Sequence, residues 1–317
     1  MADVLVIGGT GFVGSAVVRH CLVKQHAVTL LNRGSRRIEG AHQLVADRND
    51  GEALSAALHG ERFDVVIDTN CYTPAQARGL IDVITGSAPR VVAISSASVY
   101  ADAAFQPPRE SEPIGGASVW GDYGRDKSAM EDVYRASAAR FDYCGLVRPP
   151  YIFGPGNSSD RETWFWTRQL RGEAVILPGD GETQAHFVHA DDLAAAIEML
   201  ARGQRRGLDI FNVADPRALR FSELASLLAQ VAGAEDLQWA AGDLARDIPA
   251  RAWFPFRDYP CLTDPAKLLA ETDWRPAASL KDRFAETFSA YDPTALRAGF
   301  RPTPAEQALI RAHSSTP

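Results

Sequence analysis

Cysteine is scarce in this sequence, and no two cysteines stand close together. The 317 residues include only Cys21, Cys71, Cys144 and Cys261, and none of them forms a CxxC pair. A disulfide-stabilised fold or a structural zinc site needs closely spaced thiols or imidazoles. We therefore expect neither, and interpret the four cysteines as buried free thiols.

An excess of positive charge and long apolar runs are also missing. The 33 Lys and Arg residues stand against 40 Asp and Glu, a formal net charge of −7. That balance gives no basic footprint for nucleic acid and disfavours an anionic membrane. No stretch approaches the roughly 20 apolar residues of a membrane span. The strand-like run from Val4 leaves no room for a signal segment, so we expect a cytoplasmic protein.

Short apolar runs alternate with amphipathic stretches through the first half of the chain. We predict strands at Val4–Ile7, Val28–Leu31, Val65–Ile67, Val91–Ile94 and Cys144–Val147. Between them we predict helices at Gly11–Lys24, Glu52–Leu58, Pro74–Thr85 and Tyr123–Ala139. This alternation is typical of a doubly wound parallel sheet with helices on both faces, joined by right-handed crossovers.

Prolines and glycines become frequent after Arg148, and the elements become shorter. We therefore place a boundary there: residues 1–148 form the sheet domain, and residues 149–317 form mainly a smaller mixed α/β lobe. Some segments of the second part are expected to return to the first domain. Helices are predicted at Asp191–Arg202, Phe221–Val231 and Leu280–Ser289, and residues 314–317 are expected to fray.

A glycine-rich turn joins the first strand to the first helix. Its sequence, Gly8-Gly9-Thr10-Gly11-Phe12-Val13-Gly14, contains GxxGxxG. Glycines let a backbone turn tightly and approach a pyrophosphate, whose charge the following helix N-terminus favours. Because a strand precedes the motif, a helix follows it and a second strand comes next, we predict a bound dinucleotide.

The second strand ends in a basic loop, Asn32-Arg33-Gly34-Ser35-Arg36-Arg37. NAD-dependent enzymes usually carry an acid here for the ribose 2′-hydroxyl, whereas a guanidinium pairs well with a 2′-phosphate. The sequence therefore favours NADP(H) as the cofactor, with NAD(H) as the alternative. The loop could also be a solvated turn without a role in cofactor binding. Asp47, after a third strand-like stretch, is a candidate partner for the adenine amino group.

A serine and a Tyr-Lys pair follow the fifth strand. Ser96 lies just beyond Ile94, and Tyr123 and Lys127 form a YxxxK motif 27 residues later. Residues at i and i+4 share one helix face. The ammonium can then stabilise the phenolate of Tyr123, which acts as acid or base, while Ser96 binds the substrate oxygen.

Six segments in this order resemble the extended short-chain dehydrogenase/reductase family, the group of NAD(P)-dependent epimerases and dehydratases. They are GGTGFVG at 8–14, SSASVY at 95–100, YGRDK at 123–127, RPPYIFGPG at 148–156, FVHADDLA at 187–194 and DWRPAASL at 273–280. The resemblance implies a Rossmann domain with a C-terminal substrate lobe, and catalytic roles for Ser96, Tyr123 and Lys127. The family uses no metal, so His186 and His189 are interpreted as structural.

We expect the cofactor to contact four segments of the chain. The candidate residues are Gly8, Thr10, Gly11, Phe12, Val13 and Gly14; Asn32, Arg33 and Arg36; Asp47 and Arg48; and Pro149. For the substrate, the candidates are Ser98, Tyr151, Arg161 and Trp164.

Three departures from the family pattern bear on the substrate. Ala97 and Ser98 stand where the sugar-nucleotide 4,6-dehydratases carry an Asp-Glu pair, which argues against dehydration by that route. Tyr151 and Ala185 stand where many nucleotide-sugar enzymes carry an asparagine and a phosphate-binding arginine. A nucleotide-diphosphate substrate would then need another anion clamp, and Arg161, Arg168 and Arg171 are the candidates.

The sequence thus predicts an NAD(P)(H)-dependent oxidoreductase that transfers hydride at a ketone or secondary alcohol of a polar, sugar-like small molecule. A nucleotide-sugar epimerase acting through a transient ketone is one alternative. A non-catalytic dinucleotide sensor or RNA-binding relative is the other. A homodimer is also compatible with the sequence.

Overall fold

The computed structural model describes residues 1–314, and the chain divides into two compact units. The first unit contains Met1–Ile152, Val188–Pro216 and Leu262–Pro276. The second contains Phe153–Phe187, Arg217–Cys261 and the chain from Ala277 onward. Later segments thus return to the N-terminal unit, and the first crossing follows Ile152 rather than Arg148.

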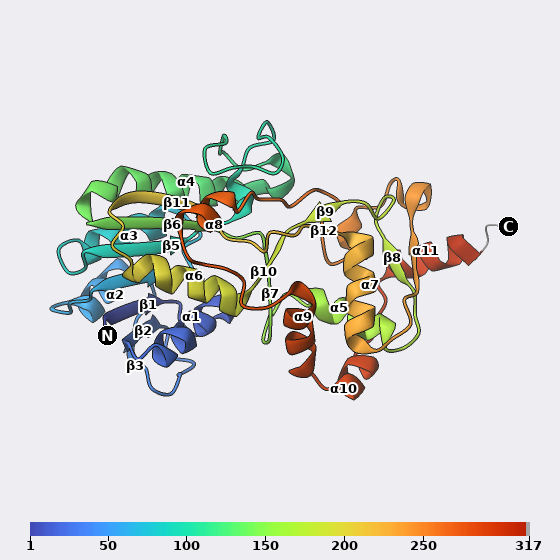
Figure 1. Ribbon diagram of the computed structural model, residues 1–317, viewed down its shortest axis with the longest axis horizontal. Coiled ribbons are helices and arrows are strands. Elements are labelled where there is room, and N and C mark those ends of the chain that lie inside the picture. The colour runs from blue at the N-terminus through green and yellow to red at the C-terminus, as the bar shows by residue number, and fades with distance from the viewer. Residues whose placement is uncertain (315–317) are drawn as a thin grey trace. The chain divides into compact units, whose positions relative to one another are not determined.

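A seven-stranded sheet of order β11-β6-β5-β4-β1-β2-β3 forms the centre of the first unit, and every neighbouring pair is parallel (Figure 1). The strands are β1 (Asp3–Ile7), β2 (Ala27–Asn32), β3 (His42–Val45), β4 (Val65–Asp68), β5 (Arg90–Ile94), β6 (Tyr143–Arg148) and β11 (Gly207–Asn212). All residues of β4 and β6 are buried, as expected for strands covered on both faces. The predicted doubly wound fold and its five strands are confirmed.

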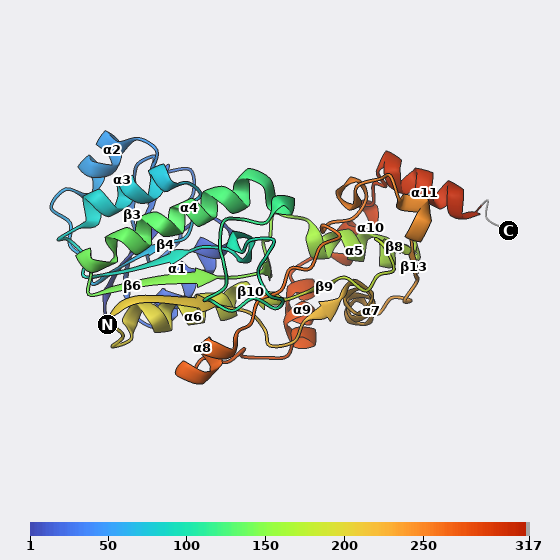
Figure 2. The same cartoon turned by 90° about the horizontal axis from the view of Figure 1, so that it is seen from above.

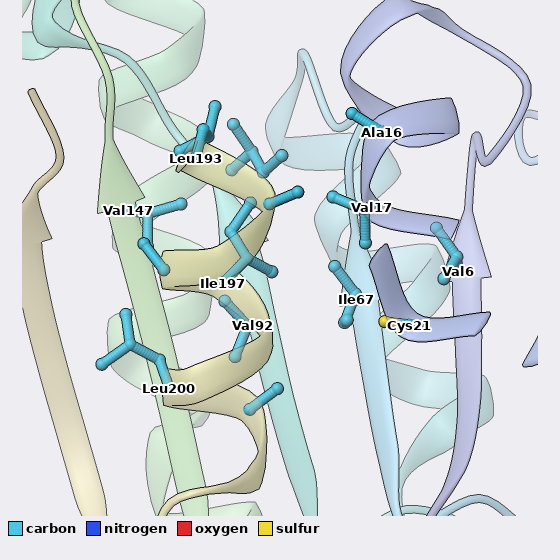
Figure 3. Close-up of a cluster of buried hydrophobic side chains, with 14 of the residues drawn as sticks. Val6, Ala16, Val17, Cys21, Ile67, Val92, Val147, Leu193, Ile197 and Leu200 are labelled. Carbon is cyan, nitrogen blue, oxygen red and sulfur yellow. The ribbon is translucent and has the colours of Figure 1, made fainter. Parts of the chain in front are cut away.

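Helices cover both faces of this sheet. They are α1 (Phe12–Val23), α2 (Gly51–Leu58), α3 (Pro74–Ile84), α4 (Gly121–Ser137), α6 (Ala190–Arg202) and α8 (Ala266–Glu271). On one face, side chains of α1 and α6 such as Val17, Leu193 and Ile197 pack with Val6 and Ile67 from the strands (Figure 3). On the other face, α2, α3 and α4 enclose a second core. The predicted helices of this unit are confirmed to within a few residues at each end.

The second unit is mixed α/β, as predicted. Its helices are α5 (Arg161–Gln169), α7 (Phe221–Ala232), α9 (Leu280–Ser289), α10 (Pro293–Ala298) and α11 (Pro304–Ser314). Its short strands form a parallel pair, β8 (Val175–Leu177) with β13 (Gln238–Ala240), and an antiparallel pair, β9 (Gln184–Ala185) with β12 (Leu219–Arg220). A further pair, β7 (Tyr151–Phe153) and β10 (Phe187–His189), lies where the chain passes between the units. Figure 2 shows the same elements from above.

Local sequence explains where several helices begin. Asp50 caps α2 by accepting from the amides of Glu52 and Ala53, and Thr73 caps α3 with Pro74 in the first turn. His189 caps α6 by accepting from the amide of Asp191 at 3.3 Å. His189 therefore has a structural task, as predicted.

The four cysteines are all buried and free, which confirms their interpretation. No helix within residues 1–314 has the length and apolar character to cross a membrane. Ser314 ends α11, and residues 315–317, where we expect fraying, lie outside the described part of the chain.

Candidate functional site

The glycine turn after β1 is shaped by close backbone contacts. Gly8 has a φ of +79°, and the amide of Gly11 donates to the Gly8 carbonyl at 3.1 Å. A Cβ on Gly14 would lie 2.3 Å from that same carbonyl, so no larger residue fits there. Helix α1 then begins at Phe12 behind a glycine N-cap, which has no side chain to satisfy the first amides. Those amides are suited to an anion such as a pyrophosphate.

A cavity of about 570 Å³ opens beside this turn. It is lined by Ile7, Gly8, Thr10, Gly11, Leu31, Asn32, Arg33, Ser35, Arg36, Ala46, Asp47, Arg48, Asn49, Asn70, Tyr72 and Gln76. Three of the sequence segments expected at the cofactor therefore meet around one cavity at the carboxyl ends of β1 and β2. This arrangement fits the adenosine half of a dinucleotide, because ligands of open α/β sheets bind at the carboxyl edge of the strands.

Four of the expected cofactor residues do not line the cavity. Phe12 and Val13 pack partly against the core beneath α1, and Gly14 lies buried under the turn. Pro149 is buried, and its carbonyl accepts from the amide of Ala97 at 2.9 Å.

The cavity also includes residues that the sequence did not single out. Asn70, Tyr72 and Gln76 follow β4 and line the cavity, but they form no recognised motif. Their place after the carboxyl end of a central strand was the only available signal.

Asn32 organises the basic loop at the end of β2. Its Nδ2 donates to the Arg36 carbonyl at 3.0 Å and to Thr10 Oγ1 at 3.2 Å. Its Oδ1 accepts from the amide of Gly34 at 2.7 Å and from Gln43 Nε2 at 2.6 Å. The loop is thus folded around one side-chain amide, while Arg33 and Arg36 stay exposed beside the cavity.

Asp47 closes a turn that also lines the cavity. Its Oδ1 accepts from the amide and from Nδ2 of Asn49, both at 2.9 Å. The Asn49 amide is the main cause that lowers the pKa of this carboxyl, and the charge of Arg33 acts in the same direction. Asp47 is therefore an ionised acceptor next to the cavity at neutral pH.

Lys127 is buried in α4, with 3% of its surface exposed. Its Nζ donates to the carbonyl of Cys71 at 2.7 Å and to the carbonyl of Ile94 at 2.8 Å. The ring of Tyr72 lies 5.0 Å from the same nitrogen. Burial lowers the pKa of this ammonium from its ordinary value to about 8, and the negative charge of Asp68 opposes that shift. The amine is thus held between the loop after β4 and the end of β5, and its pKa lies just above neutral pH.

Tyr123 and Ser96 complete the catalytic candidates. Tyr123 stands one turn before Lys127 on α4, and 45% of its surface is exposed. Ser96 follows β5, and its Oγ accepts from the amide of Ser98 at 3.2 Å. A hydroxyl that accepts one hydrogen bond can still donate its proton to a substrate oxygen. The expected helix and strand end for this motif are therefore present.

Arg48 has a different environment from the exposed arginines of the basic loop. Its guanidinium forms a buried, two-pronged ion pair with Asp68, with Nη1 to Oδ1 at 2.6 Å and Nη2 to Oδ2 at 2.9 Å. Nη1 also donates to Asn70 Oδ1 at 2.7 Å. Arg48 lines the cavity, but its terminal nitrogens are directed to protein groups.

The expected substrate residues lie in both units. Ser98 is buried at the start of the loop after β5, and its Oγ has no hydrogen-bond partner within residues 1–314. Tyr151 is buried, and its ring meets Trp120 edge to face at 6.3 Å. Both belong to the first unit.

Helix α5 of the second unit carries Arg161 and Trp164. Trp164 packs edge to face on Phe254 at 5.3 Å and lies under the guanidinium of Arg168 at 3.7 Å. It is therefore largely a packing residue. Arg161 lies 5.9 Å from the ring of Phe256 and is half-buried.

Arg168 is not a free anion clamp, contrary to the sequence expectation. Its Nε and Nη2 donate to the two carboxylate oxygens of Glu306 at 2.7 and 2.6 Å, and both side chains are almost fully buried. Glu306 comes from α11, 138 residues away, and no sequence pattern links the two residues. Arg161 and Arg171 therefore remain the candidates for an anion contact.

Comparison with known proteins identifies the same architecture. Residues 4–214 match the model of the NAD dependent epimerase/dehydratase family. The 2'-dehydrokanamycin reductase of Streptomyces kanamyceticus is 31% identical over 230 residues, covering 70% of this chain and 64% of that protein. The chloroplast stem-loop binding protein of 41 kDa b from Arabidopsis thaliana is 24% identical over 303 residues, covering 90% of this chain and 78% of that protein.

Solved structures share the fold. UDP-glucose 4-epimerase of Thermotoga maritima, with UDP-glucose, superimposes with a TM-score of 0.73 at 20% identity, covering 92% of this chain and 99% of that one. A putative epimerase from Burkholderia cenocepacia superimposes with a TM-score of 0.76 at 22% identity, covering 94% and 98%.

Proposed function

Since the chain belongs to the NAD-dependent epimerase/dehydratase family, we propose that it is an NADP(H)-preferring oxidoreductase that reduces a ketone on a small, polar, sugar-like molecule. The observation that carries this proposal is the position of Lys127. Its buried ammonium is fixed on the carbonyls that follow β4 and end β5, one helical turn after Tyr123. A side chain used only for solubility would not be buried and held in this way.

The residues around the cavity fit a dinucleotide. The glycine turn and the uncapped start of α1 would hold the pyrophosphate, and Arg33 and Arg36 would hold a 2′-phosphate. When bound, the cofactor supplies the hydride. The remaining chemistry, which is to orient the substrate and to move one proton, belongs to side chains of this protein.

Tyr123 is the proton donor in this proposal. The residue is 45% exposed and can contact a ligand, and an ammonium one turn away favours the phenolate that remains after the proton has left. Ser96 donates a hydrogen bond to the same carbonyl oxygen and stabilises the negative charge that develops there. For an alcohol as substrate the roles reverse, with Tyr123 accepting the proton.

The preference for NADP(H) is supported by Asn32. An acid at this position would accept from the ribose hydroxyls and repel a 2′-phosphate. The asparagine instead directs its amide nitrogen to the Arg36 carbonyl and folds a loop with two exposed guanidinium groups. The loop is therefore a preformed anion site.

Epimerisation through a transient ketone uses the same three side chains and is the second candidate. An RNA-binding role is the third, motivated by the chloroplast stem-loop binding relative. The net charge of −7 opposes that role, because RNA affinity rests on neutralising phosphates. The intact Ser96, Tyr123 and Lys127 have no task in it.

A substrate panel tests the proposal. NADPH oxidation is measured with free polyhydroxy ketones and with UDP-, dTDP- and GDP-linked keto-sugars. Epimerisation is measured as inversion of one stereocentre without net oxidation of the sugar. Reduction that depends on Tyr123 supports the proposal. Stereochemical inversion without cofactor consumption would favour the epimerase, and RNA binding that survives loss of Tyr123 and Lys127, with no turnover, would favour the third role.

A further inference from the structure

One of the two carbonyls that hold Lys127 lies in a loop rather than in a strand. The carbonyl that accepts from its Nζ belongs to Cys71, in the connection between β4 and α3. A connection of this kind is not held by a strand ladder, so some other contact must fix the carbonyl. Thr69 donates to the Ile7 carbonyl and the amide of Tyr72 donates to Gln76 Oε1, and an arginine from a different loop adds contacts on both sides of Cys71.

Arg48 holds the connection on both sides of Cys71. Before Cys71, its guanidinium binds Asp68 through both carboxylate oxygens and binds Asn70 Oδ1 at 2.7 Å. After Cys71, its Nη2 donates to the carbonyl of Gln76 at 3.3 Å. The connection is therefore wrapped around one planar group whose donors point in fixed directions.

Helix α4 reaches the same segment at a second point. The hydroxyl of Tyr134 donates to Asp68 Oδ2 at 2.7 Å, two turns after Lys127. Asp68 thus accepts from Arg48 and from Tyr134, and its charge is neutralised within the protein. Without that neutralisation, the cation best placed to pair with Asp68 would be Lys127 itself.

We propose that Arg48 is a positioning residue for Lys127: by binding Asp68, Asn70 and the Gln76 carbonyl, it fixes the Cys71 carbonyl and keeps the Asp68 carboxylate from competing for the ammonium. The inference rests on the proposed function only in treating Lys127 as catalytic. It assigns Arg48 to the protein interior rather than to the cofactor.

Several charged groups act on Lys127, and the direction of each matters for the test. Asp68 at the end of β4 raises its pKa, and Arg48 in the loop after β3 lowers it. The Cys71 thiol stays protonated in this range, because burial raises its own pKa. From the helix of Lys127 itself, Glu131 raises the pKa of the ammonium, while Glu131 is itself paired with Arg148 of β6 at 2.6 Å. Burial remains the largest cause and lowers the value.

Lysine is rare enough in this protein to observe Lys127 directly. The sequence contains only Lys24, Lys127, Lys267 and Lys281. Protein labelled with carbon-13 at lysine Cε gives a spectrum of four signals, and Lys127→Arg identifies the relevant one. Its titration requires neither substrate nor turnover, so the result does not depend on the proposed function.

In wild type, the Lys127 signal is expected to titrate with a midpoint of about 8. Arg48→Gln leaves Asp68 unpaired and should raise the midpoint by about one pH unit or more. Asp68→Asn should lower it. Arg48→Lys keeps a cation beside Asp68 but cannot form the bidentate ion pair. Compared with Arg48→Gln, it should therefore restore the Lys127 midpoint more fully than it restores turnover.

Arg90→Gln is the matched control, because Arg90 also binds backbone carbonyls within the first unit, at the end of α6. It should reduce stability without moving the Lys127 midpoint. If Arg48→Gln does not fold, Arg48→Met/Asp68→Leu removes both charges together and avoids an unpaired buried ion.

The expected result for the double variant is an altered Lys127 chemical shift together with a loss of turnover of ten-fold or more. A Lys127 midpoint and chemical shift that match wild type in Arg48→Gln would overturn the inference. Where that variant does not fold, a wild-type Lys127 chemical shift in Arg48→Met/Asp68→Leu would overturn it. If the midpoint responds to Arg48 but Lys127→Arg leaves turnover intact, the coupling stands and the proposed catalytic role of Lys127 fails.

Discussion

Asn32 and Arg36 are joined by a hydrogen bond from the side-chain amide of the first to the carbonyl of the second, at 3.0 Å. Gln43 Nε2 donates to the same carbonyl at 3.1 Å from the neighbouring strand β3. The loop that carries the exposed arginines is therefore supported by two neutral amides. A carboxylate in place of Asn32 could donate to neither Thr10 nor the Arg36 carbonyl.

Arg33→Asp is expected to reverse or flatten the cofactor preference. Wild type should bind NADPH more tightly than NADH, because a charge-assisted contact to a 2′-phosphate contributes roughly 1.5 to 3 kcal/mol. Titration of both cofactors by calorimetry measures this difference. If wild type binds NADH as tightly as NADPH or more tightly, the basic loop is a solvated turn with no role in cofactor selection.

A neutral change in the same loop gives a matched comparison. Gln43→Leu removes the donors to Asn32 and to the Arg36 carbonyl without altering any charge. The substitution should weaken the binding of NADPH more than the binding of NADH, because only the 2′-phosphate of NADPH needs the ordered loop. Equal weakening of both cofactors would mean that Gln43 supports the fold rather than the phosphate site.

Tyr123→Phe is expected to abolish most turnover while cofactor affinity is retained. Loss of a general acid typically costs about 10² to 10⁴-fold in rate. Lys127→Ala should weaken both turnover and cofactor binding. Rates are measured with saturating NADPH, and affinities by titration without substrate. A Tyr123→Phe enzyme within a few-fold of wild type would remove this tyrosine from the mechanism.

Arg161→Ala is expected to raise KM for a phosphorylated substrate far more than for a neutral one. The loss of a charge-assisted contact corresponds to roughly ten-fold or more. Arg171→Ala is the matched comparison, because Arg171 is the other candidate for an anion contact, is more exposed than Arg161 and lies 4.0 Å from Glu173. If Arg161→Ala leaves efficient turnover of a UDP-sugar unchanged, Arg161 does not bind the phosphate of the substrate.

Glu162 predicts a pH-dependent stability. It is buried in α5 and accepts from Asn157 Nδ2 at 3.2 Å, and burial raises its pKa from the ordinary value of 4.5 to about 7. The folded chain therefore holds a proton that the unfolded chain releases, so stability present at low pH is lost as pH rises from about 4.5 to 7.

The size of the loss follows from linkage, at about 1.4 kcal/mol for each pH unit of the shift, or roughly 3 kcal/mol as an upper figure. Urea unfolding at several pH values measures it. Glu162→Gln should flatten the dependence across this window, and Glu173→Gln, at an exposed position nearby in sequence, should not. An unchanged slope in Glu162→Gln would show that this carboxyl does not titrate with folding.

The features that depend on local spacing could be predicted from the amino-acid sequence alone. The alternation of apolar runs and amphipathic stretches defined β1, β2, β4, β5 and β6 with their crossover helices. Gly8 and Gly14 were recognisable because a backbone that turns this tightly tolerates no side chain. The YxxxK pair was recognisable because a helix brings every fourth residue to the same face.

Which distant groups meet depends on the three-dimensional packing of the chain. Arg48 pairs with Asp68 across 20 residues, Lys127 with Cys71 across 56, and Arg168 with Glu306 across 138. Strand β11 joins the sheet beside β6, and its inclusion follows from crossover topology rather than from periodicity. Arginines therefore lie in different environments in this protein. Arg33 is exposed in a loop, whereas Arg48 and Arg168 are buried because the fold places a carboxylate opposite each. A buried charge is stable only when its partner is also present, and the identity of that partner is fixed by packing, not by sequence distance.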